Sequence, residues 1–175
     1  MNENASLLPR LLYIGDVPVA NSVAGASLLF RLLKLYPSEK LYICCPIDHE
    51  MKLLPGVAYY STNVRFPRLL RSRFASLYCC WLTWRCYGPP HWARRVAKEF
   101  KPEAILSVSQ TDGWITAWRL ASLLGVPFHL IAHDDHAFAN YLPKRFRGWA
   151  SDNFASAYRS AASQLCISPM MIGAY

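Results

Sequence analysis

The amino-acid sequence predicts an α/β fold in which a doubly wound, mostly parallel sheet is covered by helices. Short continuous apolar runs alternate along the chain with longer segments of helical periodicity. A strand covered on both faces needs such a continuous run, whereas a half-exposed strand alternates apolar and polar residues. The connections are short, and the sequence shows no internal repeat or linker, so we expect a single domain over 1–175.

Six segments have the composition of buried strands. The first ends in Gly15 and the second is closed by Pro46, while the third is the weakest of the set. The predicted strands cover 11–15, 41–45, 57–61, 104–109, 128–132 and 164–168. In a doubly wound sheet the carboxyl ends of the strands form the edge at which ligands bind. We therefore look for functional residues directly after these strands.

The helices between the strands have readable starts. Asn21 or Ser22 can cap a helix that Pro37 stops, and Thr111 or Asp112 can cap the helix after the fourth strand. Free backbone N–H groups at such helix starts, together with the helix dipole, attract anionic groups.

Composition narrows the class of protein. The chain is 53% hydrophobic and 17% charged, which is enough apolar material for a full core. No apolar run approaches the roughly 20 residues needed to cross a bilayer, and the first ten residues lack a secretory pattern, so we expect a cytoplasmic protein. The net charge of +8 favours phosphate-bearing partners: nucleic acid, nucleotide-sugars or an anionic membrane face.

Cysteine and histidine spacing predicts no metal site. The six cysteines form no C-x-x-C motif and no zinc spacing, so we expect them to be reduced and structural. His133 and His136 have the spacing of a ligand pair, but no third ligand lies near them in the sequence.

The segment 65–84 is rich in arginine and aromatic residues. On a helical wheel one arc collects Phe66, Leu70, Phe74, Leu77, Trp81 and Trp84. Two interpretations stay open. The arc packs on the sheet as core, or Arg71, Arg73, Trp81 and Trp84 dock on an anionic membrane surface. No zinc module, homeodomain pattern or RNA-binding aromatic signature is present, so no nucleic-acid partner is expected.

The motifs of several enzyme classes are missing. The loop after the first strand lacks G-x-G-x-x-G, and the chain has neither a G-x-S-x-G elbow nor a P-loop. The remaining candidates are His133 and Asp134, which follow the fifth predicted strand, and the loop from Asp16 to Gly25 after the first strand. Histidine can act on a sugar hydroxyl or a phosphate near neutral pH.

Four segments carry a family resemblance: the first strand with its loop into 25–29, then 100–107, 124–134 and 161–171. Taken together, they resemble the N-terminal half of a retaining GT-B glycosyltransferase of the glycosyltransferase-4 type. The resemblance implies a Rossmann-like acceptor-side domain. It also implies a second, donor-binding domain that would follow it and is expected to be absent from these 175 residues.

The resemblance also implies roles for single residues. His133 would contact the donor sugar with Asp134 beside it, and Gln110 and Asp112 would help frame the acceptor. The cleft-lining positions of the first loop fall on Asp16, Asn21, Ser22 and Gly25, although the paired glycines usual in the family are missing from this loop. The implied enzyme uses a nucleotide-sugar as donor substrate, without a metal or another cofactor. Several family members act on lipid-linked acceptors, so the implied location is cytoplasmic or peripheral on the cytoplasmic membrane face.

Two other functions remain open at this point. One is a non-catalytic membrane-docking or scaffold subunit of a split glycosyltransferase. The other is a different sugar-nucleotide enzyme of similar architecture, such as a non-hydrolysing epimerase.

Overall fold

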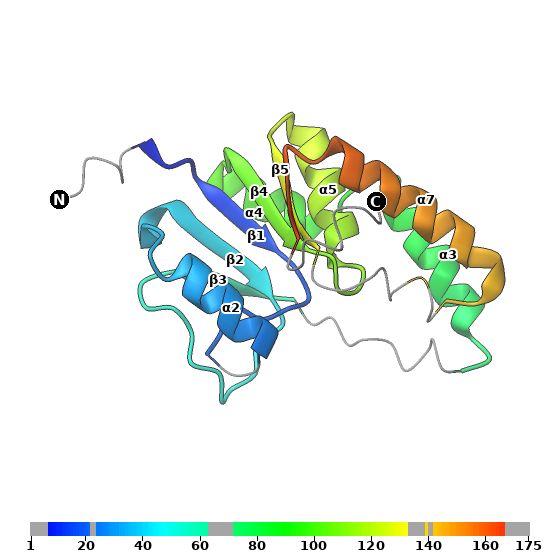
Figure 1. Cartoon of the computed structure of the whole chain (residues 1–175), viewed down its shortest axis with the longest axis horizontal. Coiled ribbons are helices and arrows are strands. Elements are labelled where there is room, and N and C mark those ends of the chain that lie inside the picture. The colour runs from blue at the N-terminus through cyan, green and yellow to red at the C-terminus, as the bar shows by residue number, and fades with distance from the viewer. Residues whose placement is uncertain (1–6, 22–23, 63–71, 133–138, 140–141, 167–175) are drawn as a thin grey trace.

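The computed structural model describes residues 7–21, 24–62, 72–132, 139 and 142–166, and within these ranges one sheet organises the chain. Its strands are β1 (Leu11–Ile14), β2 (Leu41–Cys45), β3 (Ala58–Ser61), β4 (Ala104–Val108), β5 (Phe128–Ala132) and β6 (Ser163–Cys166). The strand order is β3-β2-β1-β4-β5-β6 and every neighbouring pair is parallel (Figure 1). The structure confirms the predicted α/β class and its Rossmann-like architecture.

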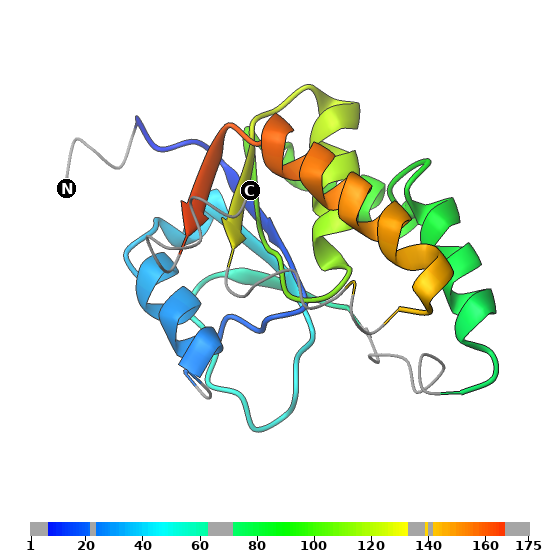
Figure 2. The same ribbon diagram turned by 45° about the vertical axis from the view of Figure 1, so that its right-hand side comes forward.

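Helices cover both faces of this sheet. Helix α2 (Ala24–Leu33) lies on one face, while α5 (Gly113–Leu124) and α7 (Lys144–Ser160) lie on the other, with the strands between them (Figure 2). Helix α4 (His91–Phe100) packs on the same side as α5. One core cluster joins Tyr13 and Ile43 to Leu29 of α2, and a second joins Leu12 to Trp114 and to the helices of the opposite face. Alternating strand residues therefore supply the two cores.

Helix α3 (Ala75–Arg85) packs beside α7 rather than on the sheet (Figures 1 and 2). Its buried residues are Tyr78, Cys79 and Leu82, which meet Leu142 and Ala150. The interpretation that the wheel arc forms core is wrong for the described residues. The exposed fractions on that arc are 44% for Phe74, 67% for Leu77, 45% for Trp81 and 71% for Trp84. The stripe faces outward because the neighbouring helix α7 covers the other side of α3.

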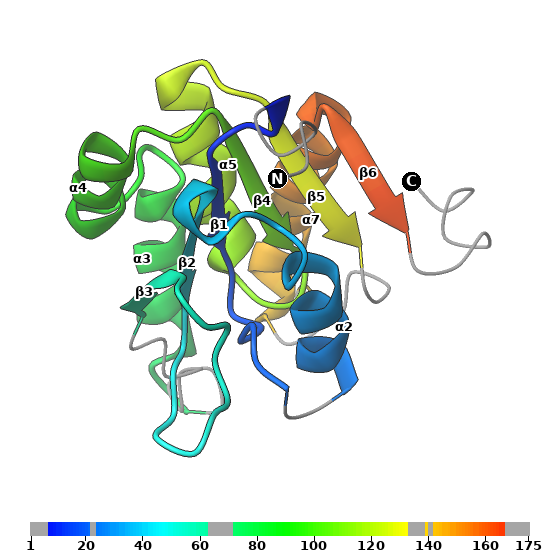
Figure 3. The same cartoon turned by 90° about the vertical axis from the view of Figure 1, so that its left-hand side faces the viewer.

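All strands end at one edge of the sheet, as Figure 3 shows for β4, β5 and β6. Because β1 and β4 are neighbours, the segments that follow Ile14 and Val108 meet there, and the end of β5 at Ala132 lies one strand further along. We expected the first loop and the segment after the fifth strand to leave the same edge. The parallel sheet confirms that expectation for the strand ends.

All six cysteines lie in the described part of the chain and all are free. Cys44, Cys45, Cys79 and Cys86 are buried, and burial raises the pKa of the Cys45 thiol to about 11. Such thiols stay protonated at neutral pH and act as small core residues. Over the described ranges, no helix is both long and apolar enough to cross a membrane.

Candidate functional site

A half-buried carboxylate that follows one strand caps the helix that follows another. The backbone N–H of Gly113 donates to Asp16 Oδ2 at 2.7 Å, and the Thr111 hydroxyl donates to the same oxygen. The sequence predicted the cap of this helix at Thr111 or Asp112; the predicted position is right, but the capping bond comes from another residue. Asp112 occupies the N-cap position but makes no capping bond with its side chain. The charge of Asp16 instead satisfies the free N–H group across the β1–β4 boundary.

Asp112 uses its carboxylate to bind an arginine. It is 1% exposed, and its Oδ2 accepts a hydrogen bond from Arg85 Nη1. The Tyr78 hydroxyl approaches the other oxygen, Oδ1, at a long 3.4 Å. Arg85 also donates to the Thr116 hydroxyl, and its guanidinium lies 4.8 Å from the centre of the Trp81 ring. A buried carboxylate needs such a partner, because an unpaired buried charge is strongly destabilising.

The pKa of Asp16 is raised in this network. Burial, and then the charge of Asp112, raises the pKa of Asp16 to about 6. The hydrogen bonds from Thr111 and Gly113 and the charge of Arg85 oppose that rise. Burial also raises the pKa of the Tyr78 phenol, with the charge of Asp112 adding to the effect, so Tyr78 remains neutral. Perturbed groups of this kind cluster at functional sites, although structural ion pairs produce them too.

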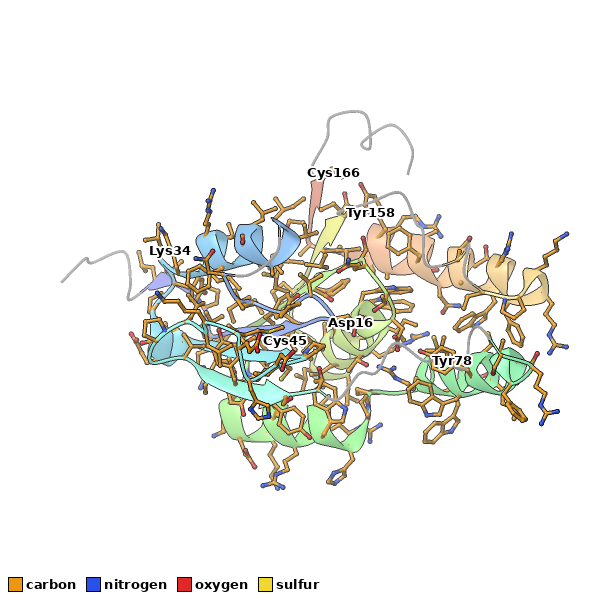
Figure 4. The ribbon with its side chains drawn as sticks, turned by 90° about the horizontal axis from the view of Figure 1, so that it is seen from below. Asp16, Lys34, Cys45, Tyr78, Tyr158 and Cys166 are labelled. Carbon is orange, nitrogen blue, oxygen red and sulfur yellow. The ribbon has the colours of Figure 1, made fainter. Side chains whose placement is uncertain are left out.

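Beside this network lies a cavity of about 780 Å³, which we call the aromatic cleft. Figure 4 shows Tyr78 on α3, and Asp16 at the end of β1. Six of the residues lining the cleft are aromatic: Tyr60, Tyr78, Trp81, Trp84, Tyr87 and Trp92. Its polar lining includes Thr62, Arg85, His91, Arg94 and Asp112. Both the volume and the mixture of rings with a few polar groups are typical of ligand pockets.

Two walls face each other across the cleft. On one, Tyr60 at the end of β3 stacks on Trp92 of α4, with ring centres 5.2 Å apart and planes inclined by 8°. On the other, Tyr78 and Trp81 of α3 lie 5.4 Å apart, and Trp84 extends the same helix. The side chain of Asp112 closes the cleft where α5 begins. The walls thus come from segments that are distant in the sequence.

The structure brings some of the predicted site residues together. Asp112, Trp81 and Trp84 line the cleft, and Asp16 lies behind Asp112 in the same network. Gln110 is exposed and does not line the cleft.

Other predicted residues lie apart from the cleft or outside the described ranges. The backbone N–H of Asn21 donates to the carbonyl oxygen of Lys52, and Gly25 is in the first turn of α2. Arg73 is exposed just before α3, and its guanidinium lies over the Phe74 ring at 5.0 Å. His133, Asp134, Ser22 and Arg71 lie outside the described residues.

The sequence reading missed Arg85, Tyr78 and Thr62. The alternation of aromatic and basic residues from 81 to 94 marked the region, but the pairing of Arg85 with Asp112 spans 27 positions and leaves no local signal. Among the described residues, no group of three or more histidine, cysteine or acidic side chains could hold a metal ion. The His133 and His136 pair lies outside those residues, so the absence of a metal at this pair stays a prediction.

Comparison with known proteins adds little to this geometry. No protein-family model and no curated protein matches the chain. Among solved structures it is similar to L-threonine dehydrogenase from Clostridium difficile, with a TM-score of 0.41 and 9% sequence identity. The match covers 71% of this chain and 36% of the dehydrogenase. A similarity this low carries no argument about activity, so the function must be argued from the site.

Proposed function

We propose that this chain is the acceptor-binding domain of a glycosyltransferase that moves a sugar from a nucleotide-sugar to a hydroxyl group. The observation that supports the proposal is the aromatic cleft itself, six rings around a buried Asp112–Arg85 pair at the ligand edge of the sheet. A sugar ring has apolar C–H faces and a rim of hydroxyl groups. It therefore suits aromatic walls with a few fixed polar groups between them.

Asp112 is the group in the cleft best suited to an acceptor hydroxyl. Its Oδ2 is taken by Arg85, whereas the 3.4 Å contact from Tyr78 leaves Oδ1 able to accept a shorter bond. A hydroxyl that donates to Oδ1 would lie between the walls formed by Trp81 and Trp92. We propose that Asp112 orients the acceptor in this way, with Arg85 holding the carboxylate in place.

The donor side of the proposal rests on the sequence resemblance. There His133 would contact the donor sugar beside Asp134, and a second domain would carry the nucleotide-sugar. The start of α2, after Asn21 and Ser22, leaves the same sheet edge as Asp112. No metal takes part in the proposed transfer.

Sugar transfer and sugar binding test the proposal separately. The chain, combined with a donor-binding half and a panel of nucleotide-sugars, should transfer sugar, and His133→Ala should reduce the rate. The full chain alone should bind free glucose, mannose or N-acetylglucosamine with a change in tryptophan fluorescence. Trp84→Ala should weaken that binding about tenfold, which corresponds to the loss of one ring contact. Leu35→Ala, 84% exposed and outside the cleft, is the control. No turnover together with no sugar binding would reject the proposal.

A second candidate function is a membrane-docking or scaffold subunit, and the outward face of α3 favours it. Phe74, Leu77, Trp81 and Trp84 are exposed there, with Arg73 beside them. The first turn of α7, which packs next to α3, adds exposed basic residues including Arg145. From 65 to 101 the only acidic residue is Glu99. Exposed rings with basic neighbours suit an anionic lipid surface.

Flotation with vesicles of phosphatidylglycerol and phosphatidylcholine tests this second function. Binding should be lost when Arg71, Arg73 and Trp81 are replaced together. It should also weaken in Leu77→Ala, which lies outside the cleft, and persist in Arg159→Gln at the far end of α7. Absence of vesicle binding at low salt would reject the membrane-docking function and would leave the sugar-binding proposal unaffected.

A further inference from the structure

One buried hydroxyl in the cleft has no hydrogen-bond partner in the part of the chain that the structure describes. Thr62 is 6% exposed, and its Oγ1 makes no hydrogen bond to any described residue, although the residue lines the cleft. Thr62 follows β3, and its backbone N–H continues the ladder by donating to the Cys45 carbonyl at 3.0 Å. In an extended chain it shares a face with Tyr60, the residue that stacks on Trp92. A buried hydroxyl without a partner is costly, so a bound ligand is the natural partner for it.

The net charge of the cleft lining is positive. Asp112 is already paired with Arg85, which leaves Arg94 as the remaining charged residue of the lining, with His91 beside it. Arg94 Nε donates to the Pro89 carbonyl at 3.0 Å, while its two terminal nitrogens have no partner among the described residues. This bond fixes the guanidinium near the cleft wall and leaves its outer edge able to bind an anion in two places.

A helix begins at this point as well. Helix α4 is ten residues long and starts at His91, so its positive dipole end lies at the cleft lining. The helix start, the guanidinium of Arg94 and the Thr62 hydroxyl, which has no partner among the described residues, are three independent features of the cleft lining. Each of them suits an oxyanion with several acceptor oxygens.

We propose that the aromatic cleft binds an acceptor that carries a phosphate group, with the sugar against the rings and the phosphate held by Arg94, His91, Thr62 and the start of α4. This inference rests on the proposed function and adds the chemical class of the acceptor. A cleft lined by rings alone would select a neutral sugar, whereas the positive charge of Arg94 in the lining selects a negatively charged one. The phosphate source is a free sugar phosphate or the headgroup of a lipid-linked sugar.

The test compares each sugar with its own 1-phosphate on the full chain, by tryptophan fluorescence and calorimetry. Glucose 1-phosphate, mannose 1-phosphate and N-acetylglucosamine 1-phosphate are the probes, each against the unphosphorylated sugar. The phosphate should tighten binding by about tenfold or more for at least one sugar, as expected for charge-assisted hydrogen bonds. Raising the salt concentration should reduce that preference.

Matched variants show which residues cause the tighter binding of the sugar phosphate. Arg94→Gln should remove it, so that each sugar and its 1-phosphate bind this variant with equal affinity. Arg95→Gln changes the next residue of α4, which pairs with Glu99 outside the cleft lining, and should keep the preference. Thr62→Val, of nearly the same shape, should weaken binding of the sugar phosphate several-fold without unfolding the chain.

The outcomes separate the two proposals. Equal binding of the sugar and its phosphate, or a preference that survives Arg94→Gln, overturns this inference and leaves the sugar-binding proposal standing. Failure of every sugar and sugar phosphate to bind overturns this inference, and together with no turnover it rejects the sugar-binding proposal as well. A third arm uses phosphatidylcholine vesicles with and without a lipid-linked sugar phosphate. Binding that requires the lipid-linked sugar and Arg94 supports the inference and assigns the phosphate to a lipid headgroup, whereas binding independent of Arg94 counts against it.

Discussion

Asp16→Asn should change how stability depends on pH. Burial and the neighbouring Asp112 raise the pKa of Asp16 from its ordinary value of 3.8 to about 6. Between these values the folded chain holds a proton that the unfolded chain has released. The stabilising effect of that proton is fully present below about pH 4 and is lost as the pH rises through about 6.

The size of the effect follows from the shift. A rise from 3.8 to about 6 corresponds to about 3 kcal/mol, which is an upper limit because the Asp16 side chain keeps some contact with solvent. We expect the free energy of unfolding of the wild type, relative to the Asn variant, to fall by about 1 to 3 kcal/mol across this window. Asparagine keeps an acceptor oxygen for the Gly113 N–H and the Thr111 hydroxyl, so the variant should fold.

Urea unfolding at a series of pH values, followed by circular dichroism, measures this difference. The wild-type curve alone is unsuitable, because a chain of net charge +8 also changes its self-repulsion as other carboxylates titrate. Subtracting the free energy of unfolding of Asp16→Asn from that of the wild type at each pH leaves the contribution of Asp16. Asp152→Asn, exposed on α7, is the control and should keep the wild-type profile. A difference between wild type and Asp16→Asn that stays constant or grows from about pH 4 to 7 would refute the assigned environment of Asp16.

Three further substitutions test the packing around the site. Thr62→Val should raise the free energy of unfolding of the ligand-free chain by about 1 kcal/mol, since it removes a buried hydroxyl that has no partner among the described residues. A lower melting temperature of this variant would show that the hydroxyl has a partner. Gly113→Ala should lower the free energy of unfolding by about 1 to 3 kcal/mol, because the added Cβ would lie 2.9 Å from Asp16 Oδ2 and 3.1 Å from the Asp16 backbone nitrogen. Gly148→Ala on α7 is the control. Its Cβ would meet nothing within 4 Å, so the variant should be slightly more stable than wild type in the same denaturation assay. Arg85→Met should lower the free energy of unfolding by about 3 to 5 kcal/mol, because it leaves the Asp112 carboxylate buried without its ionic partner. A melting temperature equal to that of the wild type would contradict the pairing of Arg85 with Asp112.

The strands were predictable because each is a continuous apolar run bounded by a turn signal. The run 41–45 became β2 with unchanged bounds, and 128–132 became β5. Such runs need no knowledge of distant neighbours, since burial on both faces is encoded in the local composition. The structure also places Gly125 at the C-terminal cap of α5 with a φ of 67°, a conformation that glycine adopts at little cost.

The α5 cap and the face of α3 could not be predicted in the same way. Asp16 caps α5 from 97 positions away, and local sequence offered Asp112 for that role. On α3 the wheel grouped the tryptophans on one arc and left open whether that arc is core or surface. Helix α7 covers the side that carries Tyr78 and Cys79, so the arc is exposed. Which side of a helix is buried depends on its neighbour, and α7 lies about sixty residues further along the chain.

The cleft depends on the same long-range packing. Tyr60 and Trp92 stack only because β3 and the start of α4 come together, and the sequence shows the two aromatic residues without their contact. Sequence reasoning therefore identified the aromatic and basic character of the region, while its use as a cavity wall required the tertiary structure.

The indole N–H signals of the six tryptophans give the most direct test of sugar binding in the aromatic cleft. Three of these residues, Trp81, Trp84 and Trp92, line the cleft, while Trp114 and Trp118 are buried residues of α5. In a ¹⁵N-labelled chain titrated with a sugar 1-phosphate, the three cleft signals should shift and saturate together, and the two core signals should stay in place. Saturable binding that leaves the three cleft signals unmoved would contradict the account.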